Sequence, residues 1–334
     1  MTLQAETSVL RDLPRFGLGA AGLGNLYSEV SEVEALDALL AARDAGLDLI
    51  DTSPFYGHGL SEQRIGDCLS QVSWRPAIST KVGRVLDPAG DGPVPDNGFA
   101  SPAPFIPRFD YSASGIRQAF EGSKARLGVD TVDTLLLHDI GRLTHGDAHE
   151  KILSQALNEA LPEMAMMKAE GLTSRIGLGV NEIEVCQEVI DQFDLDIILL
   201  AGRYTLLEHE ASLSFLDSCH ERGISVMIGG AFNSGLLVSA ENQPLRYDYD
   251  TAPEWAVEKA ARLREVCARF DVPLPAAALQ FCAAHPAVST VLAGARARSE
   301  VRQIADWTDT KIDPDLWDAL RDAGLISGNA PVPA

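Results

Sequence analysis

Four ionisable side chains of different chemistry lie close behind short apolar runs in the first half of the chain. Asp51, Lys81 and His138 each end such a run, and Tyr56 lies five residues beyond Asp51 in a loop with proline and glycine. Loops that a rigid scaffold positions often carry function. A free phenol has a pKa of ~10, and an ammonium group paired with a carboxylate favours the phenolate, which moves that pKa toward neutral pH. We therefore interpret Tyr56 as a general acid or base.

Each of these residues also has a simpler explanation when it is taken alone. Asp51 could cap a helix, Lys81 could be a surface amine, and His138 could be an ordinary core histidine. The functional interpretation depends on the elements that position them. A β/α barrel brings the carboxyl ends of its strands to one rim and keeps its chemistry there.

Short apolar runs and helical segments alternate along the whole chain, which predicts one α/β domain with a parallel sheet. We predict eight strands, at residues 16–18, 47–50, 77–80, 132–137, 175–180, 197–200, 225–228 and 288–292. Helical spacing is found at residues 33–45, 62–69, 114–127, 151–170, 183–193, 211–222, 255–270 and 276–285. This rhythm favours a single (β/α)8 TIM barrel domain over residues 1–334, rather than an open doubly wound sheet.

A long loop at residues 82–110 interrupts the alternation, because it is rich in proline and glycine and too long for a plain connector. It follows the third predicted strand and therefore belongs to the active-site end of the barrel. Phe99, Phe105 and Ile106 could form one wall of a substrate pocket. A disordered surface insertion is the alternative.

The composition limits the partners of the chain. Its 334 residues are 46% hydrophobic and 22% charged, and the net charge of -21 argues against nucleic acid or an anionic membrane as a partner. The five cysteines are widely spaced and form no CxxC pair, which is typical of reduced thiols. No signal pattern opens the sequence and no run approaches ~18 apolar residues, so we expect a cytoplasmic protein without a membrane span. The oligomeric state stays open.

The motifs around the four ionisable residues resemble those of the aldo-keto reductases. The resemblance extends from residue 16 to about residue 304, and its most specific parts are DTSPFYG at 51–57, GLSE at 59–62, STK at 79–81 and LH at 137–138. It implies that Tyr56 donates or accepts the proton and that Lys81 and Asp51 tune Tyr56. It also implies that His138 orients the substrate oxygen.

The same resemblance implies a nicotinamide dinucleotide as cofactor. The residues matched to its site are Gly19, Ala20, Asp51, Asn181, Gly230, Phe232, Asn233, Ser234, Gly294, Ala295, Arg296 and Glu300. Three positions depart from the family, since Val180 replaces a Ser, Ala201 replaces a Gln, and Gly229 replaces a Tyr that stacks on the nicotinamide in many members. These departures and the segment RYTLLE at 203–208 resemble one branch, the aldose 1-dehydrogenases and pyridoxal 4-dehydrogenase.

The segment after the last predicted strand bears on the choice between NAD and NADP. In members that prefer NADP, a Lys and an Arg hold the 2′-phosphate, and alignment places Gly294 and Glu300 at those positions. A carboxylate repels a phosphate and can accept a hydrogen bond from the 2′-hydroxyl. We therefore predict NAD, with NADP possible because Arg296 or Arg298 could reach a phosphate.

For this branch the resemblance implies that a small-molecule hemiacetal is oxidised to a lactone, with hydride transfer to the cofactor. An aldose such as L-fucose, or pyridoxal, would supply the cyclic hemiacetal. One alternative is a general aldehyde or ketone reductase on the same fold. A Schiff-base aldolase or lyase that uses Lys81 is another. A non-catalytic, nucleotide-sensing subunit is the third.

Two further patterns suggest other sites. Residues 17–22 match the GxGxxG of Rossmann proteins, but no helix is predicted to open at the last glycine, so we reject that interpretation. His145 and His149 have the spacing of metal ligands. Because no third ligand is near them in the sequence, we interpret them as part of a solvated loop and predict no metal site.

Overall fold

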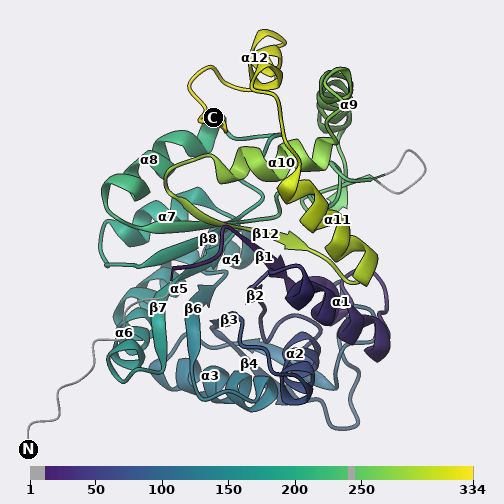
Figure 1. Ribbon diagram of the computed structural model, residues 1–334. Helices are drawn as coiled ribbons and strands as arrows, with labels where there is room; N and C mark the ends of the chain where they lie inside the picture. The colour runs from purple at the N-terminus through teal and green to yellow at the C-terminus, as the bar shows by residue number, and fades with distance from the viewer. Residues whose placement is uncertain (1–11, 240–244, 334) are drawn as a thin grey trace, which may run out of the picture.

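The computed structural model describes residues 12–239 and 245–333, in which eight parallel strands close into one barrel (Figure 1). Around the barrel the strands follow the order β1, β12, β9, β8, β7, β6, β3 and β2. Their bounds are β1 Phe16–Gly19, β2 Leu49–Asp51, β3 Ala77–Val82, β6 Val132–His138, β7 Thr173–Val180, β8 Ile197–Ala201, β9 Ser225–Gly229 and β12 Val288–Gly294. The predicted barrel and its eight strands are confirmed.

Helices surround the strands, with α1 and α11 on one side of the barrel and α6 and α7 on the other (Figure 1). Their bounds are α1 Glu32–Asp44, α2 Leu60–Gln71, α3 Ala113–Leu127, α4 Arg142–His145, α5 His149–Gln155, α6 Leu161–Ala169, α7 Ile183–Ile190, α8 Leu213–Glu221, α9 Glu254–Arg269, α10 Leu274–Ala283, α11 Arg298–Asp309 and α12 Asp315–Asp322. The helix predicted at 151–170 consists of α5, a π-helical turn and α6. The sequence pattern did not predict α4, α11 or α12.

The alternation of side chains along each strand explains why the ionisable residues gather at one end. Every second residue of a barrel strand points inward. The inward apolar side chains form one cluster, made of Leu49, Ala77, Leu136, Ile197, Leu199, Met227 and Leu292. In the same phase, two or four residues further along β2, β3 and β6, lie Asp51, Lys81 and His138. An apolar plug therefore fills the barrel beneath these three side chains.

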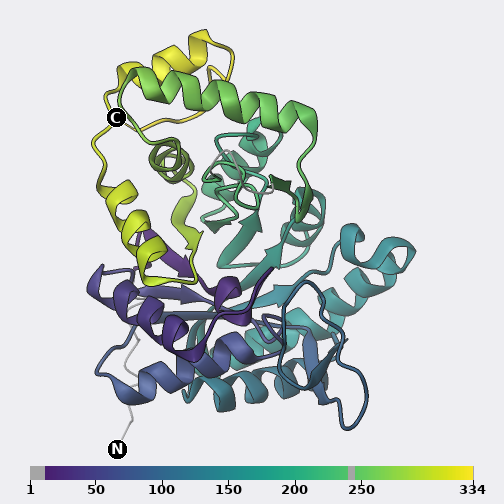
Figure 2. The same cartoon turned by 90° about the vertical axis from the view of Figure 1, so that its right-hand side faces the viewer.

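The insertion after β3 contains an antiparallel hairpin of β4 Arg84–Pro88 and β5 Phe105–Phe109, where the sequence predicts an irregular loop. Its tip binds the loop that follows β1, because Tyr27 N–H donates to Gly98 O at 3.1 Å and Ala100 N–H donates to Asn25 O at 3.0 Å. Figure 2 shows this blue excursion beside the teal helices that follow β6. The alternative of a disordered insertion is wrong, since the segment forms a folded wall at the carboxyl-end rim.

A second excursion follows β9 and contains the short hairpin of β10 Arg246–Tyr247 and β11 Asp250–Thr251. Both excursions stand at the carboxyl ends of their strands, which is the end that carries the ionisable side chains. Between β1 and α1 the chain forms a 3₁₀ turn at Ala20–Gly24, so no helix opens at the last glycine of the GxGxxG match. Within residues 12–239 and 245–333, every helix is too short or too polar to cross a lipid bilayer.

Candidate active site

Lys81 connects Asp51 to Tyr56 at the inner rim of the barrel. Its Nζ donates to Asp51 Oδ2 at 2.7 Å, to Thr52 O at 2.9 Å and to Tyr56 Oη at 3.1 Å. Ser79 Oγ donates to the other carboxylate oxygen of Asp51 at 2.8 Å. The ammonium group of Lys81 has three protons, and each is donated to one of these three acceptors. The Tyr56 oxygen therefore accepts one hydrogen bond from Lys81. The hydroxyl proton of Tyr56 is therefore available to a different acceptor.

Burial dominates the ionisation of Tyr56. Desolvation raises the pKa of Tyr56 to about 12, although Lys81 lowers it, and Asp51 raises it further. Burial lowers the pKa of Lys81, but Asp51 and Tyr56 together raise that pKa above its ordinary value. At neutral pH the pair is an ammonium group and a neutral phenol. The expectation that Lys81 and Asp51 bring the phenol toward neutral pH is wrong for the ligand-free protein, because desolvation outweighs the nearby ammonium.

The contacts of His138 assign its tautomer. Nδ1 lies 3.2 Å from Ser53 Oγ, and Nε2 lies 3.4 Å from Asp139 Oδ2. Ser53 Oγ accepts the N–H of Phe55 at 3.1 Å, so its own proton can be donated to Nδ1. The carboxylate that faces Nε2 requires a proton on that nitrogen. Both contacts favour the neutral imidazole with Nε2–H. The 3.4 Å contact with Asp139 is long for a hydrogen bond, so this proton can be shared with an acceptor in the site.

His138 lies against Tyr56, with ring centroids 6.3 Å apart and the rings edge to face. Burial lowers the pKa of His138 well below its ordinary value, and the charges of Arg84 and Lys81 lower it further. The imidazole is therefore uncharged at neutral pH. A neutral N–H donor and a phenol thus lie side by side above the apolar plug.

A close backbone contact holds the Tyr56 loop in place. Gly57 has a φ of 63°, in the left-handed region that favours glycine. A Cβ added to Gly57 would lie 2.4 Å from Gly24 O, and a Cβ on Gly24 would lie 2.5 Å from the carbonyl carbon of Tyr56. Two glycines are therefore needed for the loops after β1 and β2 to touch and fix the position of the phenol.

Phe99, at the tip of the β4–β5 insertion, is buried against the same loop. Its ring lies 6.2 Å from the Tyr56 ring and 5.4 Å from the Phe55 ring, edge-on to Phe55. Of the three apolar side chains that the sequence suggests as a pocket wall, Phe99 contacts the tyrosine loop, whereas Phe105 is half-buried and Ile106 is exposed. The insertion therefore reaches the site through Phe99.

The inner rim of the barrel divides into two arcs. The neighbouring strands β2, β3 and β6 carry the ionisable residues, and the other five strands form a continuous second arc. At the inward position nearest the rim, the second arc carries Gly19, Gly179, Ala201, Gly229 and Gly294. A Cβ on Gly179 would lie 3.2 Å from Cε of Lys81. These small residues keep side chains away from the rim beside Lys81, which is where the resemblance places the dinucleotide.

Asn233 lies after β9, in the part of this arc predicted to bind the dinucleotide. Its Nδ2 donates to Glu208 Oε1 at 3.2 Å, whereas its Oδ1 is buried and has no hydrogen-bond partner within the described residues. A buried acceptor without a partner costs free energy, which a ligand donor would recover. Gly230, which begins this loop, has a φ of 64° and permits the sharp turn out of β9.

Three other residues predicted to bind the cofactor lie around the same excursion. Phe232 packs edge-on against Trp307 of α11, with ring centroids 5.8 Å apart. Ser234 Oγ accepts the N–H of Tyr249 at 2.9 Å. The Tyr249 phenol lies within hydrogen-bonding reach of the Asn181 side chain, which follows β7. The β10–β11 turn therefore connects the loops that follow β9 and β7, a role for Tyr249 that the sequence did not reveal.

The loops after β1 and β12 touch where the resemblance places further cofactor contacts. Gly19 and Gly294 are register partners at the ends of β1 and β12. Ala20 and Ala295 follow them and are buried. A Cβ on Gly22 would lie 3.2 Å from Ala295 O, so the two loops pack through their backbones.

Glu300 lies in the first turn of α11 rather than in an open loop. Its Oε2 accepts the N–H of Arg296 at 2.8 Å, and its Oε1 lies 3.5 Å from Nε of the same arginine. Arg298 pairs with Asp37 of α1 at 3.2 Å. Each of the two arginines that could reach a 2′-phosphate therefore has a carboxylate partner already.

His145 and His149 do not belong to a solvated loop, and that interpretation is wrong. His149 is buried, with Nδ1 3.2 Å from Ile140 O and Nε2 3.1 Å from Glu188 Oε2. His145 Nε2 lies 2.8 Å from Asp139 O and 3.0 Å from Tyr111 Oη. Both rings hold the segment that follows β6, because the turn at Asp139 needs partners for its carbonyl groups.

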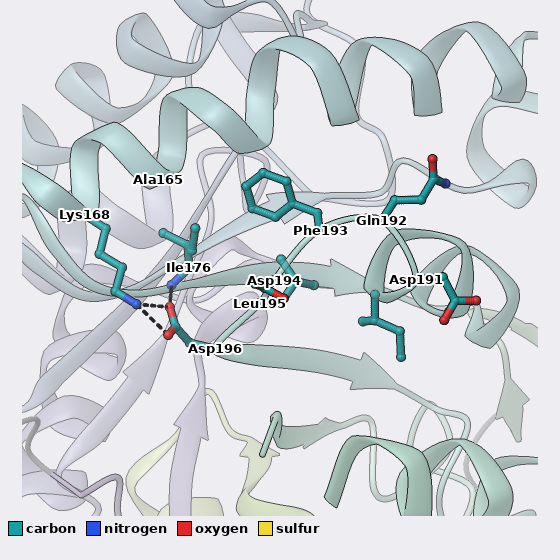
Figure 3. A pocket seen from close by; sticks show the side chains of 10 residues that line it. Ala165, Lys168, Ile176, Asp191, Gln192, Phe193, Asp194, Leu195 and Asp196 are labelled. Atoms are coloured by element: carbon teal, nitrogen blue, oxygen red, sulfur yellow. Dashed lines mark hydrogen bonds and ion pairs between the residues drawn. The ribbon is translucent and has the colours of Figure 1, made fainter. Parts of the chain in front are cut away.

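A surface hollow of about 630 Å³ lies between α6, α7 and the segment that leads into β8. Figure 3 shows the side chains that line it. Lys168 Nζ donates to both carboxylate oxygens of Asp196, at 2.5 and 2.7 Å, and Asp196 Oδ2 also accepts the N–H of Ile176 at 2.9 Å. Asp196 directly precedes β8, so this hollow opens at the amino end of the strands. Its polar groups satisfy one another, and they hold the edge of β7 rather than a reaction site.

Comparisons with known proteins agree with this geometry. The sequence pattern of the Aldo/keto reductase family matches residues 15–324. The chain is 40% identical over 323 residues to a pyridoxal 4-dehydrogenase of Microbacterium luteolum, covering 93% of this chain and 94% of that protein. It is 38% identical over 321 residues to a D-threo-aldose 1-dehydrogenase of a Pseudomonas species, covering 94% of this chain and 95% of that protein. A solved aldo-keto reductase from Bacillus halodurans shares the fold, with a TM-score of 0.73, 22% identity and coverage of 95% of this chain and 94% of its own.

Proposed function

Because the chain belongs to the aldo/keto reductase family and is an NAD(P)-dependent oxidoreductase, we propose that it oxidises a cyclic hemiacetal to a lactone. The hemiacetal would come from an aldose or from pyridoxal, the substrates named for the two relatives at 38–40% identity. One observation carries the proposal. The Tyr56 oxygen accepts a hydrogen bond from Lys81 Nζ, so its own hydroxyl proton is available to a substrate oxygen, and the imidazole of His138 lies against the Tyr56 ring.

The chemistry divides between the substrate carbon and its hydroxyl group. A nicotinamide cofactor held by the second arc would supply the hydride acceptor, so that the C–H bond at the hemiacetal carbon could break as hydride. The O–H proton passes to the Tyr56 oxygen, and the C–O bond becomes the carbonyl of the lactone. His138 donates its Nε2–H to the same substrate oxygen and fixes its position. Lys81, held by Asp51, stabilises the negative charge of the phenolate.

The raised pKa of Tyr56 bears on the direction of the reaction. At neutral pH the phenol holds its proton, and oxidation needs a phenolate to accept one. Oxidation should therefore become faster as the pH rises. The neutral phenol is the form that reduction needs, because it donates a proton to a carbonyl oxygen. This observation favours reduction of aldehydes or ketones at neutral pH as a second candidate activity.

The surroundings of Lys81 argue against imine chemistry. A Schiff base forms only from a neutral amine that can approach a carbonyl carbon. Lys81 is buried, its three protons have acceptors, and its raised pKa keeps it protonated. Its position supports a role in tuning Tyr56 instead.

We also propose that the cofactor is NAD. The carboxylate of Glu300 lies at the start of α11, where it would repel a 2′-phosphate and could accept a hydrogen bond from a 2′-hydroxyl. Arg296 is bound to that carboxylate and to Ser28 Oγ, the latter at 2.6 Å, and Arg298 is bound to Asp37. A phosphate would have to break these pairs before an arginine could hold it.

A substrate screen tests the proposal. Purified protein is mixed with NAD or NADP and with aldoses, pyridoxal or simple aldehydes, and the absorbance of the reduced nicotinamide is followed. We expect NADH to form with at least one hemiacetal and a lactone to accumulate. Turnover of open-chain carbonyls alone, and only by reduction, would contradict the hemiacetal assignment.

A further inference from the structure

Arg84, the first residue of β4, is buried three positions beyond Lys81. The central carbon of its guanidinium group lies 3.7 Å from the ring centre of Phe55 and 4.6 Å from that of Phe109. Two aromatic faces therefore fix the plane of the cation. Such contacts stabilise a desolvated guanidinium group and restrict its motion.

Arg84 shares a carboxylate oxygen with His138. Its Nη2 donates to Asp139 Oδ2 at 2.6 Å, and the same oxygen lies 3.4 Å from His138 Nε2. The cation, the carboxylate and the imidazole thus form a row at the end of β6. Beside His138 the site therefore has a second, part-buried ion pair in addition to that of Lys81 and Asp51.

The backbone presents Asp139 to His138 at some conformational cost. Asp139 has a φ of 48°, a left-handed conformation that a residue with a side chain adopts only when its surroundings enforce it. Its N–H donates to Gly179 O at 3.1 Å. Tyr111 Oη lies 2.9 Å from the carbonyl oxygens of both His138 and Asp139, and His145 Nε2 lies 2.8 Å from the latter. Two side chains and a strand therefore hold one turn.

Stability alone does not explain this arrangement. A buried ion pair loses hydration, and replacing such a pair by apolar residues is often neutral or stabilising. Nε of Arg84 is also buried without a hydrogen-bond partner among residues 12–239 and 245–333. The Arg84–Asp139 pair lies against His138, and this position suggests that the pair acts on the histidine.

We propose that Arg84 and Asp139 are positioning residues for His138, which hold its ring in the Nε2–H tautomer, with a long contact to Asp139 that leaves this proton to be shared with a substrate oxygen, and keep the ring uncharged during turnover. The inference deepens the proposed function, because it assigns a support to the donor of that reaction. Neither residue is required to touch substrate or cofactor. Asp139 fixes the tautomer through Nε2, and Arg84 fixes Asp139 and supplies a positive charge that opposes protonation of the ring.

The charges around His138 determine in which direction its pKa changes when Arg84 is removed. Lys81 on β3 and Arg84 on β4 are cations, Asp139 is the adjacent carboxylate, and the neutral phenols of Tyr56 and Tyr249 face the same space. Burial and the two cations lower the pKa of His138. Removal of Arg84 deletes one of these cations and frees the carboxylate of Asp139. Either His138 then binds a second proton, or Asp139 takes a proton and donates it to Nε2, which reverses the tautomer.

Nitrogen-15 spectra of labelled histidine distinguish these states directly, and they require no substrate. The His138→Gln variant assigns the His138 signal among the seven histidines. In the wild-type protein we expect a neutral ring with Nε2–H from acid to neutral pH. In Arg84→Met we expect a charged ring or the Nδ1–H tautomer at neutral pH, with protonation about one pH unit or more closer to neutrality. Arg84→Lys, which keeps the cation, should stay near the wild-type state.

Kinetics supply the second measurement. In Arg84→Met the acidic limb of the pH–rate profile should move to higher pH, because His138 is protonated more easily. Asp139→Asn should lower kcat by roughly tenfold, the size of one lost hydrogen bond to a charged group, and should leave the acidic limb at its wild-type pH. Arg108→Met is the matched control, because Arg108 is an exposed arginine of the same hairpin paired with Asp87 and Asp110. Dinucleotide binding and circular dichroism check that each variant folds. If Arg84→Met does not fold, the same spectra and pH profiles are measured on Arg84→Lys and Asp139→Asn.

An unchanged His138 signal and an unmoved acidic limb in a folded Arg84→Met protein would overturn the proposal. A uniform loss of rate at every pH, with wild-type spectra, would do the same, since it would indicate a structural role only. Failure of the proposed function is a different result. In that case no hemiacetal yields NADH. The spectra of His138 need no substrate, so they still test the roles of Arg84 and Asp139.

Discussion

Replacement of Lys81 by Met should move the ionisation of Tyr56 away from neutral pH. Unit charges 3.1 Å apart interact by ~5 kcal/mol at an effective dielectric constant of ~20, an energy equivalent to a pKa change of ~4. The Tyr56 residue is half-buried as a whole, but its hydroxyl group is buried against Lys81, so solvent screens only part of this interaction and we expect a pKa change of ~2 or more. Lys81 lowers the pKa of Tyr56, so its removal raises that pKa. At any pH below both pKa values, oxidation should slow by ~10-fold for each pH unit by which the pKa rises, or ~100-fold in all.

The rate of NADH formation as a function of pH measures this change in pKa. The ultraviolet difference spectrum of tyrosinate, taken between each protein and its Tyr56→Phe counterpart, reports the same ionisation without turnover. Lys81→Arg should retain much of the wild-type profile because it keeps the cation. Lys124→Met, which removes an equal charge from α3, is the control for net charge. A folded Lys81→Met protein with the wild-type profile would refute the role assigned to Lys81.

Four further predictions concern the same site. Tyr56→Phe should lose ~10²–10⁴-fold in kcat while dinucleotide binding, followed by fluorescence, stays near normal; full activity would remove Tyr56 from the mechanism. Glu300→Arg should narrow or reverse a preference for NAD in kcat/KM, whereas Glu254→Arg, in the first turn of α9, should not; a wild-type preference for NADP that ignores Glu300 would contradict the cofactor proposal. Borohydride added with pyridoxal should leave Lys81 unmodified by mass spectrometry, and a covalent adduct on Lys81 would favour imine chemistry. Gly57→Ala should lower the free energy of unfolding by roughly 2–4 kcal/mol in denaturant titrations, because the new Cβ meets Gly24 O; equal losses in Gly90→Ala, where φ is also positive and no atom lies within 4 Å, would contradict this reason.

Much of the barrel could be predicted because its strands are buried on both faces and therefore read as short apolar runs. Asp51, Lys81 and His138 could also be placed together, because each lies at the end of an apolar run and a barrel brings its strand ends to one rim. Tyr56 could be predicted to lie at the same rim because it belongs to the loop that follows β2. These features depend on local pattern and on the general geometry of barrels, both of which a single sequence contains.

The rest of the site depends on long-range contacts that a single sequence does not display. Arg84 lies in a segment whose proline and glycine content hides the β4–β5 hairpin, so nothing marked it as buried. Asp139 gains its importance from an unusual backbone conformation that Tyr111 and His145 enforce. The sequence pattern did not predict α11, so it gave no sign that Glu300 lies in the first turn of a helix.

The ionisation of Tyr56 illustrates a second limit. Its neighbours Lys81 and Asp51 are visible in the sequence, and charge alone suggests a lowered pKa. The extent of burial is a property of the folded chain, and here desolvation outweighs the ammonium group. Residue types therefore predict which groups interact, whereas the net direction of the pKa requires the structure.

The most direct test of the proposed chemistry uses an aldose, or pyridoxal in its hemiacetal form, with deuterium at the hemiacetal carbon. The protein is incubated with this substrate and NAD, and both products are identified by mass spectrometry. The mechanism predicts deuterium on the reduced nicotinamide and a lactone that has lost it, with almost no product from Tyr56→Phe. Unlabelled NADH, or a substrate that is reduced but never oxidised, would contradict it.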